Sequence, residues 1–219
     1  METRRDHGKL VFIDVRDRTG IIEVVGGNEL GDLIPQDVVE IIGEVQKRPE
    51  KMINKDLPTG MVEVVNGKMN LIAKADPLPF DMGKDWLNLE TPTLLDHRAL
   101  TIRHKTISGI FKLGEIIVDT FRKSLKKIGF TEYESPLIVP ATAEGGAEVF
   151  QIKYFDYQAY LAQSPQLYKQ MMLGAFERVF TVTHAFRAEP SMTTRHLTEY
   201  TSLDAEMAFI DSWEDVMEA

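Results

Sequence analysis

Charged and polar side chains alternate with apolar ones through residues 186–209, FRAEPSMTTRHLTEYTSLDAEMAF. Alternate residues of a β-strand share a face, so a first strand would carry Arg187 and Glu189 together. A second strand would carry on one face His196, Tyr200, Ser202 and Asp204. Charges gathered on one face of a sheet need water, a partner or a ligand. This predicted hairpin is therefore a candidate functional site.

The other residues of the second strand predict its opposite face. Apolar side chains alternate there with the polar set, at Leu203, Ala205, Met207 and Phe209. We expect this face to pack on the core of the protein.

Residues 159–172, AYLAQSPQLYKQMM, predict a strand followed by a helix. Ser164 is a favourable N-cap residue, and Pro165 suits the first helical position. Helical spacing places on one face Gln166, Lys169 and Gln170. A lysine and two amides pointing one way suit a carboxylate ligand. A solvated helix face is the alternative, and this segment alone favours it.

The composition is that of an ordinary soluble globular protein of 219 residues, with 43% apolar and 27% charged residues. The absence of cysteine excludes disulfides, thiolate zinc sites and cysteine nucleophiles. The N-terminal sequence has no apolar signal region, and no apolar run approaches a membrane span. We expect a cytoplasmic protein with no membrane partner.

The net charge of −9 argues against a protein that holds nucleic acid by bulk electrostatics. Local phosphate contacts need only a few lysines or arginines. Between Arg98 and Lys127 the chain has eight lysines and arginines and only two acidic residues. An RNA-binding function therefore stays open.

Short strand patterns fill the first 75 residues. Residues 9–25 predict a hairpin that turns at Asp17–Gly20, and 38–49 and 59–75 predict further strands. We expect a small β-barrel over 1–75 whose first strand is missing.

Prolines and weak periodicity predict a linker at 76–100. Residues 101–128 have a helical period of apolar side chains, and Gly129 suits the C-terminal stop of this helix. One face of the helix must be buried, either in the core or in an interface. Residues 130–140 predict a return to strand.

Three blocks together resemble the aspartyl-tRNA synthetases, which are class II aminoacyl-tRNA synthetases. They are RRDHGKLVFIDVRDRTGI near the N-terminus, the long helix with GFTEYESP after it, and FRAE followed by TRHLTEYTSLDAEMAF. The resemblance implies an α+β protein. Residues 1–75 would form an OB-fold β-barrel that binds the anticodon, and 76–100 a hinge. Residues 101–219 would form the N-terminal half of a class II catalytic domain, built on an antiparallel sheet.

The resemblance implies an ATP site on the hairpin. Arg187 would grip the α-phosphate as the catalytic arginine, and His196 would lie near the triphosphate. Glu189 would bind the adenine amino group, and Tyr200 would stack on the base.

It also implies an aspartate site. Lys169 would pair with the side-chain carboxylate, and Gln166 would hold the substrate backbone, with a polar contact from Ser164. Asp204 and Glu144 would bind the α-ammonium group. Asparaginyl-tRNA synthetases do not place a lysine here, so Lys169 points to aspartate. A lysine facing a neutral amide would lack its counter-charge, which costs several kcal/mol.

In the N-terminal domain the resemblance implies that Phe12 stacks on an anticodon base and that Arg5 and Arg48 contact the anticodon loop. Glu23 departs from the family, which usually has a glutamine that reads the anticodon at this position. A carboxylate only accepts hydrogen bonds, so anticodon specificity is open there.

The long helix and Pro136 resemble motif 1, which forms the homodimer interface in the family. The implied reaction joins L-aspartate to tRNA(Asp) through aspartyl-adenylate, with ATP and Mg²⁺. Charging of tRNA(Asn) as well is left open.

Nothing in the sequence matches the third class II motif, the acidic Mg²⁺ ligands near it, or the arginine that shares the aspartate carboxylate with Lys169. We expect a fragment of a longer synthetase that contains no metal ligands and is inactive alone.

Three alternatives remain. One is a truncated or non-catalytic synthetase-like protein that binds tRNA or nucleotide, and a second is an asparagine-forming enzyme. A zinc hydrolase is the third, but the histidines lack ligand spacing.

Overall fold

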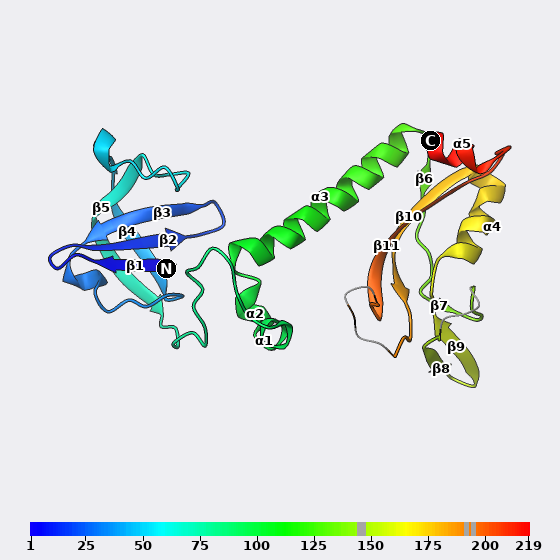
Figure 1. The fold of residues 1–219 in the computed structure, drawn as a ribbon, viewed down its shortest axis with the longest axis horizontal. Coiled ribbons are helices and arrows are strands. Elements are labelled where there is room, and N and C mark those ends of the chain that lie inside the picture. The colour runs from blue at the N-terminus through cyan, green and yellow to red at the C-terminus, as the bar shows by residue number, and fades with distance from the viewer. Residues whose placement is uncertain (144–147, 191–192, 194–195) are drawn as a thin grey trace. The chain divides into compact units, whose positions relative to one another are not determined.

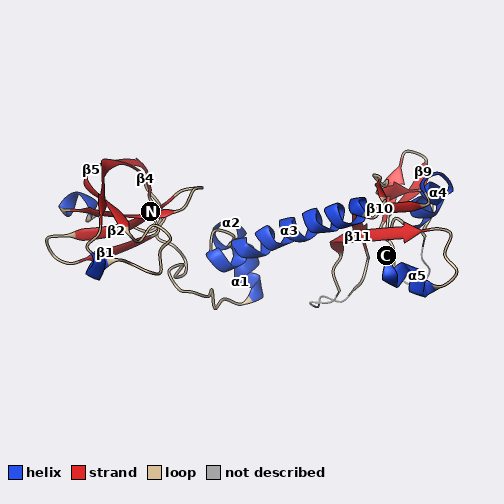
Figure 2. Cartoon of the chain, turned by 90° about the horizontal axis from the view of Figure 1, so that it is seen from above, coloured by secondary structure: helices blue, strands red, loops and turns tan. Residues whose placement is uncertain are grey.

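The computed structural model describes residues 1–143, 148–190, 193 and 196–219. The chain divides into two compact units, Met1–Ser108 and Gly109–Ala219. This division falls inside a long helix, a few residues beyond the boundary at residue 100 that the sequence predicts. Strands dominate the N-terminal unit, whereas the C-terminal unit combines helices and strands (Figure 2).

The N-terminal unit is a five-stranded sheet with the order β1-β2-β3-β5-β4 (Figure 1). Its strands are β1 Thr3–Asp6, β2 Val11–Arg16, β3 Ile21–Gly26, β4 Val38–Lys47 and β5 Val62–Ala73. The predicted hairpin and the two later strands are confirmed. Strand β1 was not predicted, because four charge-rich residues carry no alternating pattern. Five strands are the number in an OB-fold, so the expectation of a missing strand does not fit this sheet.

The turn between β2 and β3 forms as its residue types dictate. The Asp17 carboxylate accepts hydrogen bonds from the backbone N–H groups of Thr19 (2.7 Å) and Gly20 (3.2 Å). Gly20 has φ +154°, a backbone conformation that side chains disfavour.

A compact hydrophobic core holds the N-terminal sheet together. It consists of Val11, Ile13, Val24, Leu30 and Leu33. Leu30 belongs to a short 3₁₀ helix, η1 Asn28–Leu30, and a second one, η2 Glu50–Met52, lies between β4 and β5.

Two short helices occupy the end of the predicted linker. They are α1 Thr91–Asp96 and α2 Arg98–Thr101. Pro92 stands in the first turn of α1, where its missing N–H costs nothing. Helices of four and six residues are too short to show a period, so the sequence predicted only a linker.

The predicted long helix is confirmed as α3, Lys105–Lys127. It ends as its sequence predicts. Gly129 adopts φ +89°, and the Phe130 N–H donates to the Leu125 carbonyl at 3.0 Å. This is the closing bond of a Schellman motif, which turns the chain into the next strand.

The C-terminal unit is built on a sheet with the order β11-β10-β6. Its strands are β6 Thr131–Glu132, β10 Arg178–Phe186 and β11 Glu199–Met207. Strands β10 and β11 are antiparallel, and β6 runs parallel to β10. Helix α4, Gln166–Phe176, contacts one face of this sheet. On the other face Phe180 packs edge-on against Phe121 of α3 at 5.7 Å.

A second, smaller sheet has the order β7-β9-β8. Its strands are β7 Ile138–Val139, β8 Gln151–Tyr154 and β9 Tyr157–Leu161. Strand β9 leads directly into the chain before α4. The last element is α5, Trp213–Glu218, which begins with a capping box between Ser212 and Asp215.

The expected core face of β11 is wrong in part. Leu203 is 36% exposed and Phe209 is 88% exposed. Phe209 lies beyond the end of β11 with φ +58°, so the alternation no longer governs its direction. Phe121 of α3 covers this face at Phe180, and the described residues leave Leu203 partly uncovered.

Candidate active site

The β10–β11 pairing aligns the predicted polar residues on one face. Tyr200 lies opposite Ala185, Ser202 opposite Thr183 and Asp204 opposite Thr181. Residues directly opposite in an antiparallel pair point to the same side. The N–H of Arg187 donates to the Thr198 carbonyl at 2.9 Å, which extends the ladder past the end of β10. The hairpin that the sequence predicts is confirmed.

Lys169 lies under helix α4 and reaches the hairpin. Its side chain is buried, and its Nζ lies 3.0 Å from Asp204 and 3.5 Å from Glu206. Ser202 donates a hydrogen bond to the second oxygen of Asp204. The alternative of a solvated helix face is thus wrong for Lys169, although Gln170 is exposed.

Gln166 completes the contact between α4 and β11. Its amide nitrogen lies 3.3 and 3.4 Å from the two Glu206 oxygens. Ser164 accepts a hydrogen bond from the Gln166 N–H at 3.4 Å, while Pro165 takes the N-cap position. The helix therefore starts one residue later than predicted, within the usual uncertainty of helix ends. The Phe186 N–H donates to Ala162, which ties this segment to β10.

Arg187 and Tyr200 meet at the other end of this face. The guanidinium carbon of Arg187 lies 5.7 Å from the centroid of the Tyr200 ring, within cation–π range. Glu189 lies 3.6 Å from His196, whose other ring nitrogen is 2.7 Å from the Thr193 hydroxyl. Glu144 lies outside the described residues.

Glu206 and Tyr133 are members of this site that the sequence analysis missed. Glu206 continues the alternation of Ser202 and Asp204, a signal that could have identified it. The Tyr133 hydroxyl is buried and has no hydrogen-bond partner among the described residues. Burial raises the pKa of Tyr133 to about 12, helped by the charges of Asp204 and Glu206 and opposed by Ser135. This tyrosine therefore stays a neutral group that can donate a proton.

The predicted anticodon residues line a separate groove in the N-terminal unit, with a volume of about 400 Å³. It is lined by Arg5, His7, Phe12, Glu23, Arg48, Lys51, Met52, Ile53 and Asn54. The ring of Phe12 meets His7 edge-on at 5.4 Å.

Glu23 is buried at the base of this groove and pairs with both Arg5 and Arg48. Arg48 also lies 3.1 Å from Glu63, and its side chain is only 5% exposed. Arg5 is about half exposed. Arg5 is therefore the better placed of the two arginines to reach a ligand, and Arg48 holds Glu23.

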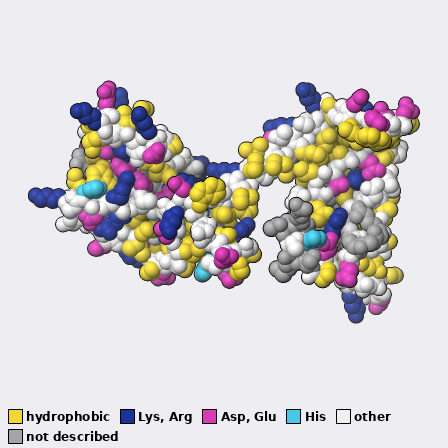
Figure 3. Space-filling view, in the orientation of Figure 1, with side chains coloured by type: hydrophobic (Ala, Val, Ile, Leu, Met, Phe, Trp, Pro, Cys, Tyr) yellow, Lys and Arg dark blue, Asp and Glu magenta, His cyan; other side chains and the backbone are white. Residues whose placement is uncertain are grey.

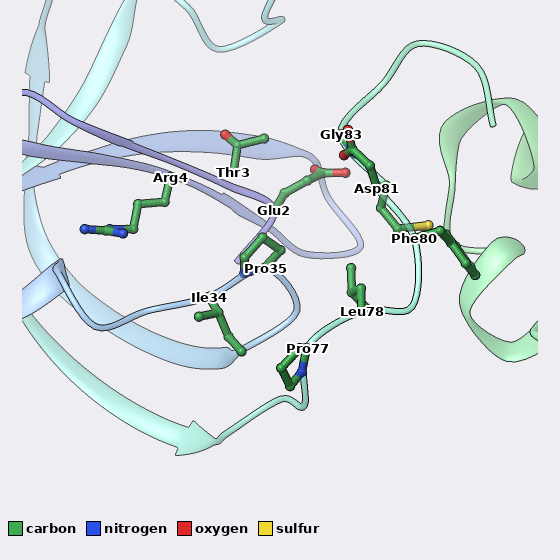
Figure 4. Close-up of a pocket in the computed structure, with 11 residues that line it drawn as sticks. Glu2, Thr3, Arg4, Ile34, Pro35, Pro77, Leu78, Phe80, Asp81 and Gly83 are labelled. Carbon is green, nitrogen blue, oxygen red and sulfur yellow. The ribbon is translucent and has the colours of Figure 1, made fainter. Parts of the chain in front are cut away.

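The largest pocket among the described residues, about 470 Å³, lies elsewhere in the N-terminal unit (Figure 4). Strand β1, the Ile34–Pro35 loop and residues 77–83 line it, mostly with apolar atoms. It contains no predicted site residue.

Helix α3 exposes an apolar stripe of its own (Figure 3). Within the C-terminal unit the stripe consists of Ile110, Phe111, Leu113, Ile116 and Ile117. Pro136, the other predicted interface residue, is exposed.

Within the described part of the chain, no group of three or more acidic or histidine side chains could hold a metal ion. None of the described helices is long and apolar enough to cross a membrane.

Sequence comparison identifies the family. Residues 90–219 match the profile of "tRNA synthetases class II (D, K and N)", and residues 1–72 match that of "OB-fold nucleic acid binding domain". The chain belongs to the class II tRNA synthetases of the D, K and N group. This confirms both the α+β fold and the expected resemblance.

Curated relatives include an aspartate–tRNA(Asp/Asn) ligase of Deinococcus radiodurans, 43% identical over 99% of this chain and 48% of the relative. An aspartate–tRNA(Asp) ligase of Pyrococcus abyssi is 40% identical over 98% of this chain and 50% of the relative. The chain thus spans about half the length of these relatives.

Among solved structures, the chain is similar to asparaginyl-tRNA synthetase from Pyrococcus horikoshii in complex with asparaginyl-adenylate. The TM-score is 0.86 at 34% identity, over 99% of this chain and 50% of that one. A putative aspartyl-tRNA synthetase from Leishmania major gives a TM-score of 0.86 at 30% identity, over 99% and 45%.

Proposed function

We propose that the complete protein ligates L-aspartate to tRNA at the expense of ATP, through aspartyl-adenylate. The observation that carries this proposal is the position of Lys169, a buried cation beside Asp204 on the floor of the site. The aspartate–tRNA ligase relatives support the same reaction.

Lys169 would bind the side-chain carboxylate of aspartate, and Gln166 and Ser164 would position the substrate backbone. Asp204, and Glu144 from outside the described residues, would bind the α-ammonium group. One lysine faces two carboxylates here, so the pocket itself has an excess negative charge. This excess favours the ammonium end of the substrate, while Lys169 distinguishes a carboxylate from an amide.

ATP would lie toward the Arg187 end of the same face. Tyr200 offers an aromatic surface for adenine, and Glu189 an acceptor for its amino group, while His196 lies near enough to Glu189 to orient it. Tyr200 and Asp204 are four residues apart, about 14 Å along the strand. That distance leaves room for the α-phosphate between the base and the amino acid.

In the first step the aspartate α-carboxylate attacks the α-phosphate, and pyrophosphate leaves. In the second step the terminal 3′-hydroxyl of tRNA attacks the acyl carbon and releases AMP. No protein nucleophile is needed. Arg187 stabilises the negative charge that develops on the α-phosphate, and the fixed pocket supplies alignment. Mg²⁺, when bound with ATP, would neutralise phosphate charge, and its ligands are not among the described residues.

The N-terminal sheet would bind the anticodon, with Phe12 as a stacking surface worth roughly 1–3 kcal/mol per base. Arg5 would contact the anticodon loop directly, and Arg48 would act through Glu23. We propose that both tRNA(Asp) and tRNA(Asn) are substrates, because the Deinococcus radiodurans relative is named for both. The cytoplasm, where tRNA is charged, is the expected compartment.

The apolar stripe of α3 would form a homodimer interface together with Pro136. The stripe supports this proposal because a row of exposed isoleucines, with leucine and phenylalanine, is costly in water.

Aminoacylation by the complete gene product tests the proposed function. We expect transfer of labelled aspartate to transcripts of tRNA(Asp) and tRNA(Asn), but no transfer of asparagine. Charging of tRNA(Asp) alone would restrict the tRNA range. A folded protein that charges neither would instead be a binding protein.

A further inference from the structure

Tyr133 lies beside the aspartate site without belonging to any of the contacts described for it. It follows β6, the strand that pairs parallel to β10. The pairing sets Thr131 beside Val179 and Glu132 beside Phe180. The Tyr133 N–H donates to the Phe180 carbonyl at 3.1 Å and continues this ladder by one residue. Tyr133 therefore lies next to Thr181.

The direction of the Tyr133 side chain follows from its neighbours. Glu132 points to the α3 face, where it pairs with Arg122 and Lys126 at 2.7 Å each. Successive residues of a strand point to opposite faces. Tyr133 consequently points to the other face, toward α4 and Lys169.

Asp204 lies in the same row of the sheet as Tyr133. Thr181 pairs with Asp204 across β10 and β11, and Tyr133 flanks Thr181 on its other side. Two strand spacings separate Tyr133 from Asp204, about 10 Å between backbones. A tyrosine is long and the intervening threonine is small, so the phenol can lean over Thr181 toward the carboxylate.

The hydrogen bonds of this row are incomplete. The Tyr133 hydroxyl oxygen is buried and has no partner among the described residues. A buried hydroxyl without a partner costs free energy, so its presence calls for an explanation. Asp204 has two donors, Lys169 and Ser202, and loses one of them if Lys169 turns to a substrate carboxylate.

We infer that Tyr133 is a positioning residue that donates its hydroxyl proton to Asp204 when the substrate takes Lys169. This inference rests on the proposed aspartate site. In the free site Lys169 neutralises Asp204, and Tyr133 is held in reserve. When aspartate binds, its carboxylate competes for Lys169, and the hydroxyl of Tyr133 rotates to replace that donor. Asp204 then keeps its charge and its orientation toward the α-ammonium group.

The Tyr133→Phe variant of the complete protein tests this inference, because it removes only the hydroxyl. Wild type and variant are compared by aspartate-dependent ATP–pyrophosphate exchange. We expect the KM for aspartate to rise about 10-fold, the loss of one hydrogen bond to a charged group, while the KM for ATP is unchanged. The melting temperature without ligand should not fall, whereas its rise on adding aspartate should shrink.

Two further variants separate positioning from packing. Tyr157→Phe removes a hydroxyl from a tyrosine that is 75% exposed at the tip of the β8–β9 hairpin, and it should behave like wild type. Tyr133→Leu removes the ring as well. If the ring matters only for packing, Tyr133→Phe will be normal and Tyr133→Leu impaired, and the inference is overturned.

The remaining outcomes are also decisive. An equal rise in both KM values in Tyr133→Phe would indicate general damage and overturn the inference. Wild-type exchange with asparagine in place of aspartate would overturn the proposed substrate only, and Tyr133→Phe would then be judged by its KM for asparagine. Wild-type protein that exchanges with no amino acid would overturn both.

Discussion

Individual side chains in the two proposed sites are held by ion pairs that make their geometry specific. In the groove, Glu23 joins Arg5 and Arg48, while in the active site Lys169 joins Asp204 and Glu206. Both sets are largely buried, so each charge depends on its partner. Replacing one member should therefore affect the others.

Glu23→Gln tests this dependence in the N-terminal unit. The change removes a buried negative charge between two arginines, so we expect the unfolding free energy to fall by about 1–3 kcal/mol. It also frees positive charge beside the groove, so affinity for tRNA should rise several-fold at low salt. Filter binding and thermal unfolding measure the two effects.

The control is Glu44→Gln, because Glu44 is exposed on β4. It removes the same charge outside the groove and should leave stability nearly unchanged. Weaker tRNA binding by Glu23→Gln would contradict this account and would indicate that the carboxylate itself accepts a hydrogen bond from the anticodon.

Among the elements, the loop before β4 is fastened by one buried carboxylate. Asp37 is fully buried and accepts hydrogen bonds from the N–H groups of Ala75 (2.7 Å) and Ile34 (2.9 Å), with Lys74 at 3.2 Å. Burial alone would raise the pKa of Asp37, but these donors outweigh it and hold the pKa below its usual value of 3.8.

Because the folded pKa of Asp37 is depressed, its stabilising effect is complete above the unfolded pKa and is lost as the pH falls through the folded one. We expect Asp37→Asn to lower the melting temperature by roughly 5 °C at pH 7. The difference should shrink below pH 3.8, where protonation removes the charge in the parent as well. Asp76→Asn, at an exposed position, is the control. A pH-independent difference would show that the charge is not the cause.

Helix α3 permits a second test at this scale. Ile116 is 60% exposed, so Ile116→Asp should cost the isolated fold little, yet it places a charge in the proposed dimer interface. We expect the complete protein to change from dimer to monomer by analytical ultracentrifugation. Lys112→Asp places the same residue on the polar side of α3 and should remain dimeric. A dimeric Ile116→Asp protein would place the interface elsewhere.

The sequence predicted elements with a clear period and missed those without one. The β2–β3 hairpin, α3 with its stop at Gly129, and the β10–β11 hairpin all follow from local spacing and turn residues. Strand β1 and helices α1 and α2 are too short for a period, and tertiary contacts define them.

The site shows the same limit. Alternation aligned Asp204 with Ser202 and Tyr200, but it could not place Lys169 against them, because α4 reaches β11 only through the fold. Glu206 was visible in the pattern and was missed. Tyr133 was not visible, because its place in the row depends on the pairing of β6 with β10.

At the scale of the whole molecule, the chain combines an OB-fold unit with a class II catalytic unit and spans about half the length of its relatives. The account assigns tRNA recognition to the first unit and amino-acid choice to the second. The central claim concerns that choice, and it depends on a single buried cation.

The most direct test compares wild type with Lys169→Gln in the complete gene product, by ATP–pyrophosphate exchange with aspartate and with asparagine. Wild type should exchange with aspartate alone. Lys169→Gln should lose about 100-fold or more of its aspartate activity, because Asp204 and Glu206 then repel the substrate carboxylate without a counter-charge. The exposed Lys153→Gln is the matched control and should remain fully active. Aspartate exchange that survives in Lys169→Gln, or wild-type exchange with asparagine, would contradict the account.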